Sequence, residues 1–262
     1  MPKTLIVPVD GSDASERAVP VAQRLARQIG NCDIVVIAAC LTDDKHALGV
    51  YLDALVERVG TDVTRTDVVE EADPAVAILR AAENASDAII CMATHGRGRL
   101  AAPFLGSVAT EVLRRTATPV VLVGPHCETS WWHDPPRVVA CWCGEPSNPI
   151  LLPAQELTEA LGGELWLESV FHPLDIHAAE NLHGEFEPAL RRIGTGTDVH
   201  LLTEFSEYPA GAIARSAREI PATLLAMTTH ARTGIARAAL GSVTMDVVHH
   251  SPCPVFVVGG PR

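Results

Sequence analysis

Glycine, serine and arginine residues gather between residues 95 and 107 in a pattern suited to binding a phosphate group. His95-Gly96-Arg97-Gly98-Arg99 combines two cations with a glycine-rich backbone, and Gly106-Ser107 precedes a helical pattern over Ser107–Arg115. The first amides of a helix lack partners within the helix, and its dipole places positive charge at that end. A phosphate suits such a place. Gly106 would allow close approach, Ser107 would add a hydroxyl, and the two arginines would add charge.

A second group of polar residues follows the first apolar run. Asp10-Gly11-Ser12 comes directly after Leu5–Val9, where Asp10 could accept a hydrogen bond from an adenine amino group or a ribose hydroxyl. Each part also has a structural interpretation, because Gly-Ser is a common helix cap, Asp-Gly-Ser a common turn, and Gly-Arg-Gly a solvated loop. Their convergence at one edge of a sheet would favour a nucleotide site.

The elements that must position these residues alternate between strand and helix. An Asp13-Ala-Ser-Glu16 capping box, with Asp13 as the cap, is expected to open the first helix, and Gly30 to end it. Asp73-Pro74 is expected to open another helix. The expected strands are Leu5–Val9, Asp33–Cys40, Asp62–Val69, Asp87–Met92 and Pro119–Val123, and a further helix covers Ala47–Val59. This order predicts an α/β fold with a doubly wound, Rossmann-like parallel sheet.

Ligands of such folds bind beyond the carboxyl ends of the strands, where the strand order reverses. The positions to examine are therefore Asp10-Gly11-Ser12, Ala39-Cys40 and the segment from Ala93 to Ser107.

An internal repeat indicates that this architecture occurs twice. Met92-Ala-Thr-His is repeated as Met227-Thr-Thr-His, and Leu105-Gly-Ser-Val as Leu240-Gly-Ser-Val. The matched positions keep their register along the chain, which predicts two tandem open-sheet domains of about five strands each. We expect the first domain at residues 1–124, a linker at 125–136 and the second domain at 137–262. In the second half, Asn148-Pro149 is expected to open the first helix, and His172, His177 and His183 to lie in a loop.

The composition excludes several classes of protein. Apolar residues make up 47% of the 262 residues, and the formal net charge is −12. A nucleic acid or an anionic membrane would be repelled by that average charge, so an anionic ligand needs a local basic pocket. No apolar run is long enough for a membrane helix and no signal-peptide pattern is present, so a cytoplasmic location is expected.

The seven cysteines are scattered along the chain. Cys141-Trp-Cys143, with Cys127 nearby, could bind a metal, but its spacing is not the usual CxxC and no second pair follows. Buried reduced thiols are favoured, and no metal site is predicted.

These motifs resemble the ATP-binding members of the universal stress protein family. The family pattern G-x2-G-x9-G-[S/T] is matched at Gly96, Gly106 and Ser107. Because both halves show the likeness, the chain is similar to tandem members. The resemblance implies ATP binding, pairing of the last strands Pro119–Val123 and Pro254–Val258 as a pseudo-dimer, and a homodimer of the whole chain. The implied binding residues are Asp10, Gly11, Ser12, Ala39, Ala93, His95, Gly96, Arg97, Gly98, Arg99, Gly106, Ser107 and Val108.

Departures from the pattern separate the two halves. Ala93 stands at the first glycine of the pattern, and two outcomes are open: its methyl group is tolerated, or it crowds the ribose or a phosphate. Thr228 and Ala231 replace both loop glycines in the second half, and Cys143 stands where the first half has Asp10. The elements that the second half keeps are His230, Arg232, Gly241 and Ser242. We therefore expect the first half to bind the nucleotide and the second half to be degenerate.

Three functions remain open from the sequence. The first is a nucleotide-dependent stress or signalling protein that binds ATP, with the need for Mg²⁺ undecided. The second is a weak ATP-hydrolysing enzyme with Asp10 or His95 as the base; the chain has no GxxxxGK[ST] motif, so a P-loop ATPase is disfavoured. The third is a scaffold that binds no ligand. An enzyme is the less favoured reading, and no catalytic residue is assigned.

Overall fold

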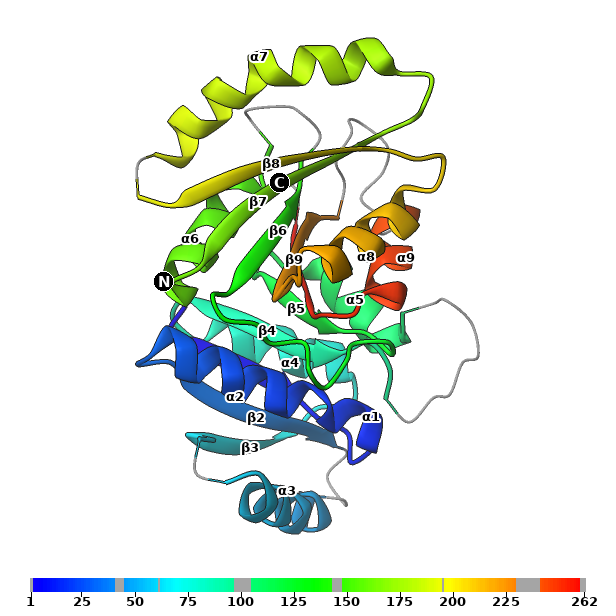
Figure 1. Cartoon of the computed structure of the whole chain (residues 1–262). Coiled ribbons are helices and arrows are strands. Elements are labelled where there is room, and N and C mark those ends of the chain that lie inside the picture. Colours follow the sequence, from blue (N-terminus) through cyan, green and yellow to red (C-terminus); the bar gives the residue numbers. More distant parts are fainter. Residues whose placement is uncertain are drawn as a thin grey trace. The chain divides into compact units, whose positions relative to one another are not determined.

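The computed structural model describes residues 2–40, 45–60, 62–96, 105–142, 148–194, 196–229 and 241–259. The chain divides into two compact units, Met1–Val123 and Gly124–Arg262. Figure 1 shows the chain coloured along its sequence and labels most of the elements of each unit.

In its described residues, the first unit contains a parallel sheet with the strand order β3-β2-β1-β4-β5. The strands are β1 (Thr4–Pro8), β2 (Asp33–Cys40), β3 (Arg65–Glu70), β4 (Ala88–Ala93) and β5 (Val120–Val123). The helices are α1 (Asp13–Glu16), α2 (Ala18–Ile29), α3 (Lys45–Val59), α4 (Pro74–Glu83) and α5 (Ser107–Arg115).

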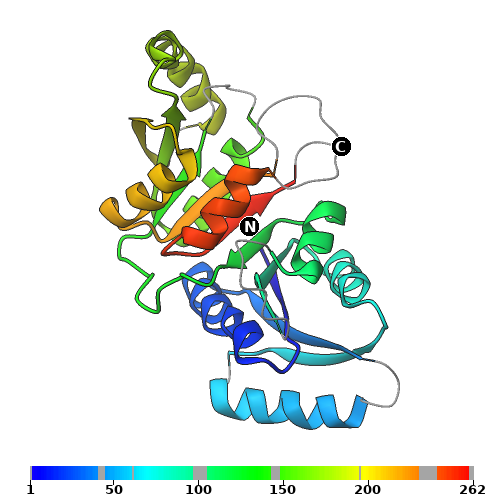
Figure 2. The same ribbon diagram turned by 90° about the vertical axis from the view of Figure 1, so that its right-hand side faces the viewer.

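Helices cover both faces of this sheet. Figure 2 shows α2 on one side of the strands and α4 and α5 on the other. The central strands are buried on both faces, and Leu5, Ile34 and Ile90 are fully enclosed. Because β1 lies between β2 and β4, the strand order reverses there, which places the switch point between β1 and β4. The predicted doubly wound α/β fold is confirmed.

Local signals set most helix ends in this unit. Gly30 ends α2 with a φ of +69°, and its amide donates to the Ala26 carbonyl. Asp73 caps α4, where its carboxylate accepts from the Ala75 amide at 2.9 Å. The prediction for α1 was wrong, because Ser12 and not Asp13 is the cap. The Ser12 hydroxyl accepts from the Ser15 amide at 3.2 Å.

The second unit repeats the arrangement within its described residues. Its parallel sheet has the order β10-β9-β6-β7-β8. The strands are β6 (Arg137–Cys141), β7 (Glu164–Phe171), β8 (Asp198–Phe205), β9 (Leu224–Thr228) and β10 (Val255–Val258). The helices are α6 (Leu151–Leu161), α7 (Ile176–Ile193), α8 (Pro209–Glu219) and α9 (Ser242–His250).

Two sequence expectations for this unit need correction. His177 and His183 belong to α7 and not to a loop, whereas His172 precedes it. The helix was missed because Pro188 lies inside it and its polar residues hide the period. The first helix starts at Leu151, and Asn148 forms the turn before it by accepting from the Ile150 amide at 3.1 Å.

Residues 125–136, assigned to a linker from the sequence, fall within the second compact unit and contact α9 and the segment that follows it. The Glu128 amide donates to the Pro252 carbonyl at 2.8 Å, and a ring nitrogen of His126 lies 2.7 Å from the His249 carbonyl. Trp131 is buried. The assignment of this segment as a linker stays a prediction.

Candidate functional site

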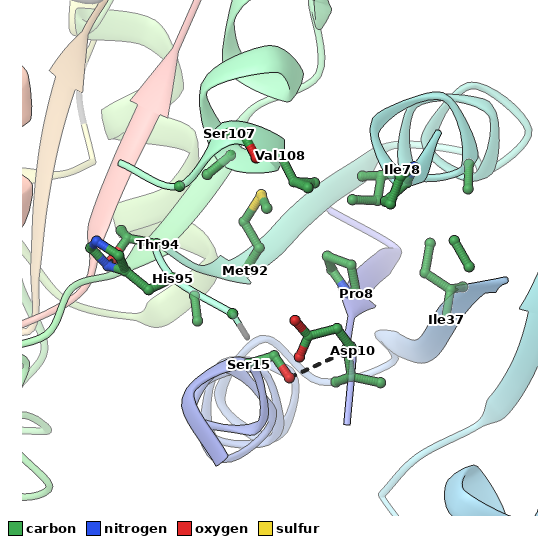
Figure 3. Close-up of a pocket in the computed structure, with 18 residues that line it drawn as sticks. Pro8, Asp10, Ser15, Ile37, Ile78, Met92, Thr94, His95, Ser107 and Val108 are labelled. Atoms are coloured by element: carbon green, nitrogen blue, oxygen red, sulfur yellow. Dashed lines mark hydrogen bonds between the residues drawn. The ribbon is translucent and has the colours of Figure 1, made fainter. Parts of the chain in front are cut away.

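A pocket of about 310 Å³ opens at the carboxyl ends of β1, β2 and β4, at the switch point of the first unit. Figure 3 shows Asp10 and Ser15 on one side, Ser107 and Val108 on the other, and Met92 between them. The pocket is lined by Pro8, Val9, Asp10, Ser15, Ile37, Ala39, Pro74, Ala77, Ile78, Met92, Ala93, Thr94, His95, Gly96, Gly106, Ser107, Val108 and Ala109.

Asp10 is held in a turn at the end of β1. One oxygen of its carboxylate accepts from the Ser12 amide at 3.0 Å and from the Ser12 hydroxyl at 2.6 Å. The Asp10 amide donates to the Ser15 hydroxyl at 3.2 Å, which Figure 3 marks with a dashed line. Gly11 lies between them with a φ of +82°, a conformation that favours glycine. The turn therefore fixes the carboxylate at the pocket wall.

Gly96 brings the chain after β4 against Asp10. A Cβ atom at this position would lie 2.2 Å from Oδ2 of Asp10. A larger residue at position 96 would thus displace the Asp10 carboxylate, so the glycine keeps the acid and the loop in contact.

Gly106 sets the start of α5. Its amide donates to the Thr94 carbonyl at 2.7 Å, and a Cβ atom there would lie 2.9 Å from the same oxygen. The close approach explains the glycine, since a backbone carbonyl cannot swing away as a side chain can. The contact places the first turn of α5 at the pocket.

The amino end of α5 points its unpaired amides toward this pocket. In the described part of the chain no side chain caps α5, in contrast to α4. The Thr110 amide donates to the Gly106 carbonyl, so the amides of Ser107, Val108 and Ala109 have no intrahelical acceptor. This end of the helix can therefore donate to an anion.

His95 lies beside these groups with one ring nitrogen satisfied. Its Nδ1 is 2.9 Å from the Thr94 hydroxyl. Its Nε2 is buried and has no hydrogen-bond partner within the described residues. That nitrogen is a polar atom that a ligand could satisfy.

The structure brings most of the sequence-predicted residues to one pocket. Gly11 and Ser12 do not line it, because they form the turn that holds Asp10. Arg97, Gly98 and Arg99 lie outside the described residues. The predicted residues that line the pocket are Asp10, Ala39, Ala93, His95, Gly96, Gly106, Ser107 and Val108.

Sequence reasoning missed the apolar wall of this pocket. Ile37, Ile78 and Met92 come from β2, α4 and β4, and together they form a surface fit for a flat apolar group. Alternation along β2 could have identified Ile37, since it lies two residues before Ala39 on the same face.

The second unit has a pocket at the corresponding place, of about 530 Å³. The amino end of α9, uncapped by side chains in the described residues, borders it at Gly241-Ser242. Trp142 and Glu168 also line it, from the end of β6 and from β7. Cys143, His230 and Arg232 lie outside the described residues.

Comparisons with known proteins agree with the geometry. The family model described as the universal stress protein family matches residues 43–124 and 143–259. The chain belongs to the universal stress protein family. Because the match covers both units, it is a tandem member.

Individual relatives support this placement. A universal stress protein of Thermus aquaticus, in the QAH/OAS sulfhydrylase 3′ region, is 33% identical over 134 residues, which are 46% of this chain and 98% of the relative. Universal stress protein MJ0531 of Methanocaldococcus jannaschii is 36% identical over 90 residues, or 32% of this chain and 52% of its own. The crystal structure of a universal stress protein from Archaeoglobus fulgidus shares the fold, with a TM-score of 0.67, 23% identity, and coverage of 98% and 96% of the two chains.

The described residues also show whether the chain has a membrane-spanning helix or a metal cluster. Among the described helices, none combines the length and the apolar character that crossing a bilayer requires. In the same residues, no three or more His, Cys, Asp or Glu side chains are placed to hold a metal ion together.

Proposed function

We propose that the first unit binds an adenine nucleotide, with ATP as the expected ligand, and that the protein acts as a nucleotide-dependent stress-response or signalling module. The observation that carries the proposal is a single pocket bounded by the Asp10 carboxylate and by the uncapped amino end of α5. An acceptor for a nucleoside and donors for its phosphates thus face one cavity.

The residues present fit such a ligand. The glycines at 96 and 106 leave space that a Cβ atom would fill, and the buried Nε2 of His95 can take a partner. The apolar wall formed by Ile37, Ile78 and Met92 suits the face of a purine ring. A volume of about 310 Å³ lies at the lower end of the usual range for ligand pockets.

Each group would have a separate role. Asp10 would accept hydrogen bonds from the nucleoside, and the amides of Ser107, Val108 and Ala109 would donate to phosphate oxygens. Arg97 and Arg99 would add positive charge next to His95. Occupancy would then act by favouring one conformation or one partner of the protein over another.

Calorimetric titration of the full chain with ATP tests this assignment. Asp10→Asn is the sharpest variant, because the amide oxygen can still accept from Ser12 and hold the turn. We expect it to weaken ATP binding roughly tenfold to a hundredfold, the value of a hydrogen bond to a charged group. Asp175→Asn is the matched control, since Asp175 lines the pocket of the second unit. It should leave ATP affinity unchanged.

An equal loss of ATP affinity in the two variants would show that the site has been assigned to the wrong unit. If the wild-type chain does not bind ATP at an ATP concentration of about 10 mM, the better interpretation is a scaffold protein that binds no ligand. Mg²⁺ is tested by repeating the titration with and without the metal.

The enzyme reading has a separate test. Asp10 already accepts two hydrogen bonds from Ser12, and Nδ1 of His95 lies next to the Thr94 hydroxyl, so both have structural roles that do not require catalysis. Hydrolysis by purified protein that is lost with Gly106→Trp would favour the enzyme. Hydrolysis that survives this substitution would come from a contaminant.

A further inference from the structure

Glu168 is a buried acid in the pocket of the second unit. Its side chain is 1% exposed, and neither carboxylate oxygen has a hydrogen-bond partner among the described residues. It lies in β7 between two buried residues, Leu167 and Ser169. Removing a carboxylate from water without a partner is costly, so such a group calls for an explanation.

Glu168 has a definite counterpart in the first unit. The Trp142 amide donates to the Glu168 carbonyl at 2.7 Å, as the Val9 amide donates to the Ile37 carbonyl at 2.8 Å. Ile37 forms part of the apolar wall of the first pocket. The second pocket thus carries the Glu168 carboxylate where the first carries the aliphatic side chain of Ile37.

The nearest polar groups do not neutralise this acid. The Ser216 hydroxyl, which has one hydrogen, lies 2.8 Å from Oε1 of Glu204 and 3.1 Å from the Ala212 carbonyl. Arg215 forms an ion pair with Glu204 at 2.7 Å. Ser216 is close enough to Glu168 to lower its pKa, but by hydrogen-bond geometry both potential donors of α8 have partners other than Glu168.

Charge in this pocket favours a cation. The titratable residues that line it are Cys141, Glu168, His172 and Asp175, and no Lys or Arg occurs among the described lining residues. These residues do not form a group suited to a metal ion within the described chain. An organic cation, in contrast to a metal ion, can be held by a single carboxylate through charge-assisted hydrogen bonds.

We propose that the pocket of the second unit binds a small organic cation, whose ammonium or amidinium group is held by the Glu168 carboxylate. A volume of about 530 Å³ accommodates a ligand with one ring. The amino end of α9 borders the same pocket and would repel a cation beside it, so the cationic nitrogen belongs at Glu168. This inference is independent of the nucleotide site in the first unit.

Benzamidinium and benzamide provide a matched pair of probes, because they share a shape and differ in charge. Calorimetric titration of the full chain should show binding of benzamidinium and at least roughly tenfold weaker binding of benzamide. Glu168→Gln should weaken benzamidinium binding by a similar factor. Glu156→Gln, an exposed acid of α6 with the same change in charge, should leave it unchanged.

The proposal fails if the wild-type chain does not bind benzamidinium at about 10 mM. It also fails if Glu168→Gln binds as tightly as the wild type, or if benzamide binds equally well. Circular dichroism establishes that the variant is folded, and the wild-type pH profile supplies a test that needs no variant.

Burial raises the pKa of Glu168 to about 7; Ser216 and Arg215 oppose the rise and Glu204 adds to it. Only the ionised carboxylate attracts the probe, which stays protonated over this range. Binding should weaken by about a hundredfold between about pH 8 and about pH 5. The same pocket is also lined by His172, Asp175 and Cys141, and a pH dependence of binding caused by them would remain in the Glu168→Gln variant. If benzamidinium binding by that variant does not change with pH, the effect is assigned to Glu168. A flat wild-type profile would overturn the proposal.

Discussion

At the scale of single residues, two acids in equivalent pockets have opposite surroundings. Asp10 is half-exposed and accepts two hydrogen bonds from Ser12, so its carboxylate has partners in the absence of a ligand. Glu168 is enclosed, and its carboxylate oxygens have no partner in the part of the chain that the structure describes. The difference follows from position, since Asp10 follows a strand whereas Glu168 lies within one.

This difference predicts a pH-dependent stability for the second unit. The pKa of Glu168 is raised from its ordinary value of 4.5 to about 7, so the folded chain binds this proton more tightly than the unfolded chain. The stabilisation is complete below pH 4.5 and is lost as the pH rises through 7, by about 3 kcal/mol at most.

The stability of Glu168→Gln should therefore change less with pH than that of the wild type. We expect the variant to gain relative to the wild type between about pH 5 and about pH 8, measured by urea unfolding at both values. Glu156→Gln serves as the control for the change in surface charge. A stability difference that does not vary with pH would mean that Glu168 keeps an ordinary pKa in the folded chain.

At the scale of elements, the starts of α5 and α9 are related but not equal. A Cβ atom at Gly106 would lie 2.9 Å from the Thr94 carbonyl oxygen, whereas one at Gly241 would lie 3.3 Å from the Thr229 carbonyl oxygen. Both helices lack a side-chain cap among the described residues. The start of α5 is thus packed more tightly against the residue after β4 than the start of α9 is against the residue after β9.

Gly106→Ala and Gly241→Ala form a matched pair that measures this packing. We expect Gly106→Ala to lower the free energy of unfolding by about 1–3 kcal/mol, because a methyl group would overlap a backbone oxygen. Gly241→Ala should cost less than about 1 kcal/mol. Thermal unfolding with calorimetry gives both values. Equal costs would show that the shorter contact at position 106 relaxes without penalty.

The sequence predicted a helix end correctly where a single residue determines that end. Asp73 caps α4 and Gly30 ends α2, as expected from their types. The error at α1 arose because Ser12 and Asp13 are both good caps, and the Ser12 hydroxyl was the one placed to bond Asp10 and the Ser15 amide. That choice depended on the turn after β1 and not on local propensity.

At the scale of the whole molecule, the two units are expected to take ligands of opposite charge. The first presents helix amides and a hydrogen-bonded acid, and the second presents an enclosed acid. Pairing of the units through their last strands, and a homodimer of the chain, stay predictions.

Hydrogen exchange on the intact protein can map both ligands at once. ATP should slow amide exchange in peptides covering residues 8–12, 92–96 and 105–110, because the ligand would contact those backbones. Benzamidinium should instead slow exchange around 168–172 and 209–213. Protection of both units by ATP to the same extent would contradict the division of roles.

Sequence patterns by themselves determined the repeated βαβ order, the place of the switch point and most of the residues around Asp10 and Gly106, because these depend on short-range periodicity and turn chemistry. The apolar wall of Ile37, Ile78 and Met92 needed the tertiary structure, since strand register and helix packing bring together residues far apart in the chain. Glu168 left a sequence signal, a lone charge in the run Leu165–Val170. Only the fold decided that Glu168 lines a pocket, because the pairing of β7 with β6 places this residue among groups far away in the chain.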